Sequence, residues 1–403
     1  MKKDIVIIGA GHGGGMTSVF LRKFKYEGEI LIIGEENQLP YQRPELSKDF
    51  LNGKISEKTL FIKKEEFYQK NKIEILLNCR VVSICKKKKE IVLENAEVIK
   101  YRILIIATGS SVKRLEIEQD NNIVRYLRNI QDSKVLKNKI TSSNAIAIIG
   151  SGYIGLEVAC AARHAGKKVT VIEIGERPMA RTVSKKISHF FRDKHISKGV
   201  SFIFNTQLCA VNNKKENINL QLKDNKLIVA DLVIAGIGIS PNTNLASDSD
   251  IDCDDGIIVD ENCMTSNKSI FAIGDCTKHP SKLYKKNLRL ESVQNAVEQA
   301  KCVARYITGK PYPYNEVPWF WTNQYNLKLQ IAGIIDPTAE YFLRGSYRQE
   351  SFSILCIKND QLLAIESVNR PSDFISGKKL IASKKKIKGN ELCKSKVELK
   401  HFI

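Results

Sequence analysis

The sequence predicts an α/β protein in which two domains built on parallel sheets precede a smaller α+β domain. The first observation is a β-branched run at 4–8 that ends in a glycine cluster, continues into an apolar helical pattern and reaches a second apolar run at 30–34. The second is that the same succession returns at 145–173. Each stretch has the length and pattern of a strand–helix–strand unit of the Rossmann type.

Further apolar runs complete this organisation. Strand-like segments follow each unit, at 102–109, 231–242 and 269–276. Beyond about residue 317 the composition changes, with clustered aromatic residues and then alternating strands at 352–357 and 361–368. We therefore expect a discontinuous first domain, a second domain and a C-terminal α+β domain, with the boundaries 1–110 plus 242–317, 111–241 and 318–403.

The glycine cluster after the first strand, GAGHGG, fits the GxGxxG fingerprint of dinucleotide binding. Gly9 would permit the tight turn, Gly11 would let the backbone approach a pyrophosphate, and Gly14 would let the helix pack closely on its strand. Glu35, at the end of the next strand, is placed to bond ribose hydroxyls. We interpret His12 as a loop residue without a chemical role. Taken alone, the fingerprint does not distinguish FAD from NAD.

The second fingerprint, GSGYIG, contains Gly150, Gly152 and Gly155, and Glu173 ends the strand that follows. A carboxylate at that position accepts bonds from an adenosine 2′-OH and repels a 2′-phosphate, which favours NADH over NADPH. Arg177 lies four residues further on and is the residue type that NADPH sites use, so NADPH stays open as the alternative. The other expected NAD contacts are Tyr153, Ile154, Glu157, Arg181 and Gly238.

Later segments indicate that the first site holds FAD. Ala107, Thr108 and Gly109 follow one strand, and Gly274 with Asp275 ends another. An acidic side chain there can bond a ribityl hydroxyl, while the neighbouring backbone amides face the phosphates.

At this point the chain resembles the NADH-dependent ferredoxin reductases of bacterial oxygenase systems, the group that includes putidaredoxin, rubredoxin and biphenyl-dioxygenase ferredoxin reductases. The resemblance covers essentially the whole length. Its marks, besides the two fingerprints, are PYQRPELSKDFL (40–51), GIGISPNT (236–243), AIGDC (272–276), RLESVQNAVEQA (289–300), VPWFWTNQYNLKLQIAG (317–333) and VNRPSDF (368–374).

The resemblance implies a set of FAD contacts at Gly13, Glu35, Lys48, Val81, Arg128, Asp275 and Val293. It also implies that Arg43 lies in a segment covering the adenine end or the flavin. Two small departures affect the expected loop geometry: Glu45 stands where the family usually has proline, and His12-Gly13 replaces a more apolar pair.

Lys48 and Glu157 are the candidate catalytic residues. The resemblance implies that they pair beside the flavin N5 region, where Lys48 would stabilise the anionic reduced flavin and Glu157 would hold Lys48 in place. The competing interpretation is an ordinary surface lysine and a glutamate favoured by the first turn of its helix. Trp319 and Trp321 are two residues apart on an extended segment. Either both anchor the C-terminal core, or at least one, with Trp319 the expected FAD contact, lies near the flavin edge where an electron acceptor docks.

Charge and cysteine content limit the possible partners. The chain has 64 basic and 44 acidic residues, a net charge of +20. This excess reflects either compositional bias or an acidic protein partner, with nucleic acid the least favoured reading because the lysine runs lack interleaved aromatic residues. The ten cysteines show no CxxC or CxxxxC spacing. We therefore expect reduced, mostly buried thiols, no dithiol relay and no bound metal.

These observations predict a cytoplasmic FAD enzyme, monomeric or homodimeric, that takes hydride from NADH. It would pass electrons singly to an acidic [2Fe–2S] ferredoxin or a rubredoxin that serves an oxygenase such as a cytochrome P450 or a ring-hydroxylating dioxygenase. One alternative is an NADH oxidase or diaphorase, although residues 36–50 hold no redox cysteine. An alternative of another class is a structural or signalling role of the apoptosis-inducing-factor type.

Overall fold

The computed structural model describes residues 2–117, 123–214, 217–395 and 397–403. The chain forms two compact units, each assembled from three segments. Unit 1 consists of Met1–Arg43, Ser56–Ser111 and Ser240–Pro318. Unit 2 consists of Pro44–Ile55, Val112–Ile239 and Trp319–Ile403.

Unit 1 is built on a seven-stranded sheet in the order β3-β2-β1-β6-β5-β4, with β18 paired to β6. Strands β1 and β2 pair in parallel, and Ile5–Ile8 lie opposite Ile30–Ile33. All eight of these residues are buried, as expected for strands covered on both faces. The elements of this unit are β1 (Lys2–Ile8), α1 (His12–Lys23), β2 (Ile30–Ile33), α2 (Glu65–Lys70), β3 (Ile73–Leu76), β4 (Val81–Cys85), β5 (Glu90–Leu93), β6 (Val98–Ile106), α6 (Asn244–Ser247), β17 (Ile257–Ile258), β18 (Ile270–Ala272), β19 (Thr277–Ser281), β20 (Lys286–Leu288) and α7 (Val293–Ile307).

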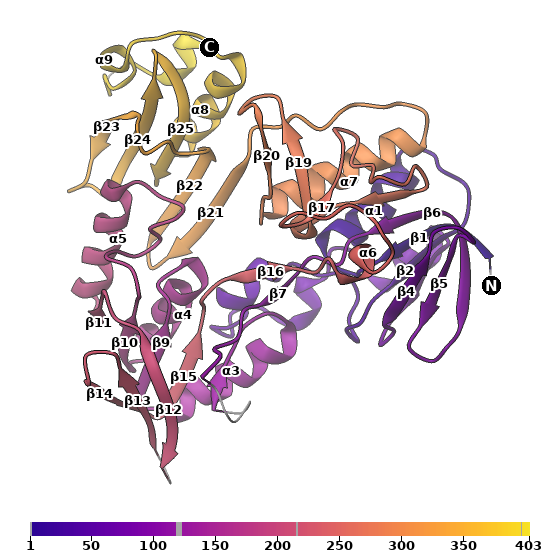
Figure 1. Cartoon of the computed structure of the whole chain (residues 1–403). Helices are drawn as coiled ribbons and strands as arrows, with labels where there is room; N and C mark the ends of the chain where they lie inside the picture. The colour runs from indigo at the N-terminus through magenta and orange to yellow at the C-terminus, as the bar shows by residue number, and fades with distance from the viewer. Residues whose placement is uncertain (1, 118–122, 215–216, 396) are drawn as a thin grey trace. The chain divides into compact units, whose positions relative to one another are not determined.

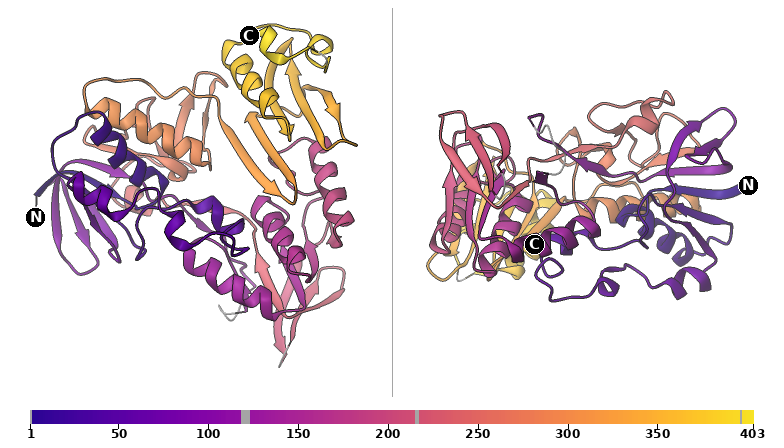
Figure 2. Two further views of the ribbon diagram at one scale, coloured as in Figure 1. Left: turned by 180° about the vertical axis from the view of Figure 1, so that it is seen from behind. Right: turned by 90° about the horizontal axis from the view of Figure 1, so that it is seen from below.

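A late segment of the chain completes unit 1. Figure 1 and the reverse view in Figure 2 show α7, in orange, beside α1, in indigo, although the two helices are far apart in sequence. Buried residues of α7, such as Ala300 and Val303, share a core with Leu21 of α1 and with β1. Residues of α7, which come after the second strand–helix–strand motif in the sequence, therefore complete the core around the first such motif.

Unit 2 contains the second parallel sheet, in the order β11-β10-β9-β15-β8, and a C-terminal antiparallel sheet, in the order β21-β22-β25-β24-β23. Helix α8 packs on β22 and β25 of the C-terminal sheet. Together the two units confirm the predicted fold class. The elements of unit 2 are β8 (Val124–Arg125), α3 (Ile130–Ser142), β9 (Ala145–Ile149), α4 (Tyr153–His164), β10 (Lys168–Ile172), α5 (Lys185–Ser197), β11 (Val200–Ile203), β12 (Leu208–Lys214), β13 (Asn217–Leu222), β14 (Leu227–Ala230), β15 (Leu232–Ala235), β21 (Trp319–Gln324), β22 (Leu327–Gly333), β23 (Glu340–Ser346), β24 (Ser351–Lys358), β25 (Gln361–Val368), α8 (Pro371–Ser383) and α9 (Gly389–Leu392).

Two short strands, β7 (Ser110–Val112) and β16 (Ile239–Pro241), lie where the chain passes between the units. Four 3₁₀ turns, at Arg43–Ser47, Glu57–Leu60, Gly274–Cys276 and Leu399–Phe402, complete the described elements. Within the described ranges, no helix is both long and apolar enough to cross a bilayer. The three-domain division expected from the sequence stays a prediction.

A buried ion pair holds helix α8 against the C-terminal sheet. Arg344 on β23 contacts Asp373 on α8 at 3.1 Å, and the side chains of both are almost fully buried. The same guanidinium donates to the carbonyl oxygens of Leu392 and Val397, which lie beyond α8. Arg344 thus provides hydrogen bonds both to the buried carboxylate of Asp373 and to carbonyl oxygens of the segment after α8.

Candidate functional site

The first glycine fingerprint forms an open cradle at the start of α1. Gly9 has φ +112°, and a Cβ there would fall on the carbonyl oxygen of Ala107. A Cβ on Gly14 would fall on the carbonyl oxygen of Gly9, so the helix and the strand approach as closely as glycine allows. At Gly11, the residue before α1, a Cβ would meet nothing within 4 Å. The backbone amides of a helix N-terminus therefore border free space, which fits a pyrophosphate group.

The second fingerprint repeats this geometry in unit 2. Gly150 has φ +93°, and a Cβ there would lie 2.6 Å from the carbonyl oxygen of Gly236. A Cβ on Gly155 would fall on the carbonyl oxygen of Gly150, whereas one on Gly152 would meet only the Gly236 oxygen, at 3.9 Å. The internal repeat seen in the sequence is thus a repeat of two cradles, each suited to a dinucleotide phosphate.

The acidic residues after β2 have different roles. Glu35 is exposed and has Arg80 3.7 Å away, so its carboxylate is accessible to a ribose. Glu36, which the sequence did not single out, accepts hydrogen bonds from Tyr41 and Arg43. Arg43 also donates to the Tyr41 hydroxyl, at 2.8 Å. Glu36 therefore fixes the segment that contains Arg43.

His12 is the first residue of α1, not a loop residue. Burial, with the positive charge of Arg43 nearby, lowers the pKa of His12 to about 4. The imidazole is consequently neutral at neutral pH and adds no charge beside the phosphate cradle.

The other residues expected to bind FAD within unit 1 lie at strand and helix ends. Asp275 follows β18 and accepts a hydrogen bond from Ser110, at 3.0 Å. Thr108 exchanges two hydrogen bonds with Asn242, which hold the loop after β6. The positions of two others follow from the elements that they begin. Val81 is the first residue of β4 and its side chain is buried in the core, and Val293 is the first residue of α7.

Glu173 joins the two loops of the second cradle. One carboxylate oxygen accepts from the backbone amide and the hydroxyl of Ser151, at 2.7 and 2.6 Å, and the other accepts from the amide of Gly175, at 2.8 Å. Arg177 donates instead to the carbonyl oxygens of Ala180 and Val183. The guanidinium of Arg177, which the sequence analysis kept as a possible partner of an NADPH 2′-phosphate, is thus engaged in these two hydrogen bonds.

The remaining expected NAD contacts also lie near this cradle. Tyr153 begins α4 and its ring lies 4.5 Å from that of Phe320, while the next side chain, Ile154, is exposed. The Arg181 guanidinium stands 3.6 Å from the position that a Cβ on Gly238 would occupy.

Lys48 and Glu157 form a buried ion pair in unit 2. Their charged atoms are 2.9 Å apart, with side-chain exposures of 9% and 2%. Lys48 also donates to the carbonyl oxygen of Pro44, at 3.1 Å. The glutamate accepts further hydrogen bonds from the hydroxyls of Ser47 and Thr322. A surface lysine and a glutamate placed only by the helix dipole do not describe this arrangement, because desolvated charges need such partners.

Two further residues expected to contact FAD lie in unit 2. The backbone amide of Arg128 donates to Asp132, just before α3. Trp319 packs against Trp321 and Phe374, with ring centroids 5.5 and 5.8 Å away. Both tryptophans are half-buried, and their shared side of β21 agrees with the spacing in the sequence.

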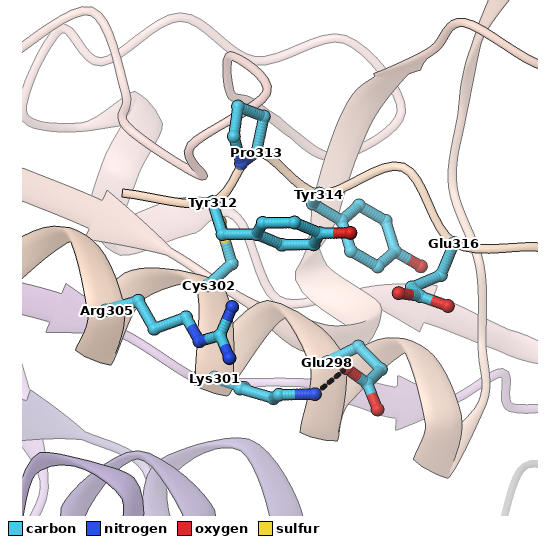
Figure 3. A pocket seen from close by; sticks show the side chains of 8 residues that line it. All are labelled: Glu298, Lys301, Cys302, Arg305, Tyr312, Pro313, Tyr314 and Glu316. Carbon is cyan, nitrogen blue, oxygen red and sulfur yellow. Dashed lines mark hydrogen bonds and ion pairs between the residues drawn. The ribbon is translucent and has the colours of Figure 1, made fainter. Parts of the chain in front are cut away.

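A cavity of about 20 Å³ lies between α7 and the segment that follows it (Figure 3). Figure 3 shows Tyr312 and Arg305 on one side, where the guanidinium stands 5.1 Å from the tyrosine ring centre, and the Lys301–Glu298 ion pair on the helix. Such a volume has room for about one water molecule. The cavity is too small for a dinucleotide.

All ten cysteines are free thiols. Five are buried, four are half-buried and Cys209 is exposed, so burial is less general than the sequence suggested. None lies in the 36–50 segment, where Lys48 is found instead.

Comparisons with known proteins place the chain among reductases. The family described as "Pyridine nucleotide-disulphide oxidoreductase" matches residues 3–300, and the one described as "Reductase C-terminal" matches residues 319–403. Rhodocoxin reductase from Rhodococcus erythropolis is 37% identical over 99% of this chain and 94% of its own. Rubredoxin-NAD(+) reductase from Pseudomonas putida is 37% identical, covering 91% and 96%. The reductase in a covalent putidaredoxin reductase–putidaredoxin complex has a TM-score of 0.96 and 33% identity, covering 99% and 97%.

Proposed function

Because this chain belongs to the pyridine nucleotide-disulphide oxidoreductase family, we propose that it is a reductase that passes electrons from NADH through FAD to a small iron–sulfur protein. The acceptor would be a [2Fe–2S] ferredoxin or a rubredoxin that supplies an oxygenase. The observation that carries this proposal is the likeness, over nearly the whole chain, to reductases named for such carriers. When bound, FAD would supply hydride acceptance from NADH and release of the two electrons singly, which no side chain can do.

The side chains and backbone contribute binding and electrostatics. The cradle at Gly11 would hold the FAD pyrophosphate against the start of α1, and Asp275 and Glu35 would take its hydroxyl groups. The cradle at Gly152 would hold the pyrophosphate of NADH. Lys48, held by Glu157, would supply a fixed positive charge to the flavin.

Glu173 supports NADH as the electron donor. Its second carboxylate oxygen accepts one bond, from Gly175, and carboxylate oxygens can accept two. That oxygen can therefore accept a ribose 2′-OH, whereas a 2′-phosphate would meet its negative charge.

Replacing Glu173 by alanine is expected to lower the ratio of kcat/KM for NADH to that for NADPH by about tenfold, the worth of one hydrogen bond to a charged group. The measurement is the steady-state rate with each coenzyme and a common acceptor. Glu176→Ala is the matched control, because this exposed glutamate lies in the same loop. An unaltered ratio in the Glu173 variant would refute the assignment.

The net charge of +20 supports an acidic acceptor. Opposite net charges accelerate association, and salt screens that attraction over a Debye length of about 8 Å at physiological ionic strength.

We expect NADH-dependent cytochrome c reduction to require an acidic ferredoxin, and its rate at limiting ferredoxin to fall severalfold as salt rises. Direct reduction of the flavin by NADH, followed in the same buffers, is the control and is expected to change much less. If the ferredoxin-dependent rate does not change with salt concentration, the net positive charge reflects compositional bias and not attraction of an acidic partner. Rapid oxygen consumption without any carrier would favour the oxidase alternative.

We also propose a cytoplasmic location. Ten unpaired thiols suit a reducing compartment.

A further inference from the structure

The strand β21 buries polar side chains where a strand normally buries apolar ones. Along Trp319–Gln324 the fully buried positions are Thr322 and Gln324, both with no exposed surface. Buried polar groups lower stability unless they are fully hydrogen-bonded, and valine has nearly the shape of threonine. A polar pair at these positions therefore calls for a reason beyond packing.

The two side chains belong to one chain of hydrogen bonds that ends on Glu157. The Thr322 hydroxyl contacts a carboxylate oxygen of Glu157 at 2.6 Å, and Gln324 contacts the Thr322 hydroxyl at 3.2 Å. His195 on α5 contacts the other end of the Gln324 amide at 2.8 Å, and the Tyr325 hydroxyl contacts His195 at 3.1 Å.

The direction of every bond follows from Glu157. An ionised carboxylate only accepts, so the single proton of the Thr322 hydroxyl is donated to it. The hydroxyl oxygen must then accept from the Gln324 amide nitrogen, which turns the amide oxygen towards His195. Burial lowers the pKa of His195 to about 4, against the Gln324 hydrogen bond that raises it, so the imidazole is neutral and has one N–H. That proton is on Nε2, and Nδ1 accepts from Tyr325.

All donors thus point towards the glutamate that holds Lys48. Glu157 has three side-chain donors among the described residues. Ser47 ends a 3₁₀ turn and Lys48 directly follows it, whereas Thr322 lies on β21 of the C-terminal sheet. The first two belong to one short stretch of the chain. Thr322 is attached to a five-stranded sheet and is fixed from behind by Gln324.

We propose that Thr322 is a positioning residue for the Lys48–Glu157 pair, and that Gln324 and His195 lock its hydroxyl as a donor to Glu157. This inference rests on the proposed role of that pair in the reaction with NADH. It assigns to the C-terminal sheet a part in holding the Lys48 charge in place.

The test compares two substitutions that separate the effect of the threonine hydroxyl from that of its methyl group. Thr322→Val keeps the volume and removes the hydroxyl, while Thr322→Ser keeps the hydroxyl and removes a methyl group. If Thr322 only fills space, the serine variant should be the more impaired. If it positions Glu157, the valine variant should be.

The measurement is flavin reduction by NADH in the FAD-loaded protein, followed by stopped-flow absorbance without any acceptor. We expect Thr322→Val to be about tenfold slower, the worth of one hydrogen bond to a charged group, and Thr322→Ser to be close to wild type. Thr265→Val is the matched control, since this buried threonine donates to the carbonyl of Ile270, and its rate should not change. A valine variant as fast as wild type, or faster than the serine variant, would overturn the proposal.

A second readout does not depend on turnover. Nitrogen-15 spectra of the imidazole groups, with the signals of His195 identified by a His195→Asn variant, should show the proton on Nε2 and no charging down to about pH 5. A proton on Nδ1 would reverse the chain and refute the inference. Failure of the proposed function is a distinct result: the wild type would then pass no electrons to an iron–sulfur carrier, while the order of the two Thr322 variants with NADH would stand.

Discussion

A Gly11→Ala variant is expected to fold normally and to be isolated with little FAD, whereas Gly152→Ala is expected to retain FAD and bind NADH poorly. The two glycines occupy the same place in their cradles, each directly before a helix. Their backbones are also alike, with φ −83° and ψ −164° at Gly11, and φ −70° and ψ −177° at Gly152. Alanine adopts both conformations without strain, so the folded chain should accept either methyl group.

The expected losses come from the space that each methyl group would fill. At Gly11 a Cβ would meet no protein atom within 4 Å, and at Gly152 it would meet only the Gly236 oxygen, at 3.9 Å. Phosphate oxygens must enter this space to reach the helix amides. Losing one or two such charge-assisted hydrogen bonds should weaken cofactor binding by about 100-fold, or about 3 kcal/mol. The measurements are the flavin-to-protein absorbance ratio after purification and the dissociation constant of NADH.

Gly9→Ala provides the contrasting control. Its Cβ would collide with the carbonyl of Ala107, and its φ of +112° disfavours any side chain, so this variant should lose stability as well as FAD. If Gly11→Ala retained its FAD while Gly152→Ala lost it, the two fingerprints would have been assigned in the wrong order.

Local sequence patterns were sufficient to predict these cradles. A strand, a GxGxxG turn and a helix lie within some twenty residues, and the last glycine of each fingerprint, Gly14 or Gly155, is required by a contact with the first glycine of the same stretch. The strands expected at 4–8, at 30–34 and at the start of 145–173 were found for the same reason, since buried parallel strands are continuous apolar runs.

The surroundings of the Lys48–Glu157 pair could not be predicted in this way. Glu157 takes its hydrogen bonds from residues 110 and 165 positions away in the sequence. No periodicity links Ser47 or Thr322 to Glu157, because only the folded chain brings their elements together. The role of Glu36 was missed for a related reason: two adjacent acids follow β2, and only their neighbours distinguish the exposed one from the one bound to Tyr41 and Arg43.

The Lys48–Glu157 pair is the feature on which the reaction with NADH should depend most. Lys48→Met removes the ammonium and keeps most of the aliphatic volume. We expect flavin reduction by NADH to slow by about 10²–10³-fold, the range found when one preorganised electrostatic donor is removed from an active site. Stopped-flow absorbance of the FAD-loaded variant measures this rate directly.

The single substitution leaves Glu157 buried without its counter-ion, which by itself costs about 3–5 kcal/mol of stability. A slow Lys48→Met variant could therefore be slow because it is damaged. The double variant Lys48→Met/Glu157→Gln removes both charges and should recover much of the thermal stability. The introduced amide oxygen can still accept from Thr322, and the amide nitrogen, at the position of the other carboxylate oxygen, can donate to the Ser47 hydroxyl oxygen. If the charge of Lys48 acts on the flavin, the double variant will remain as slow as the single one although it is stable. A stable double variant with normal FAD content and the wild-type rate of reduction would show that the pair serves the fold alone.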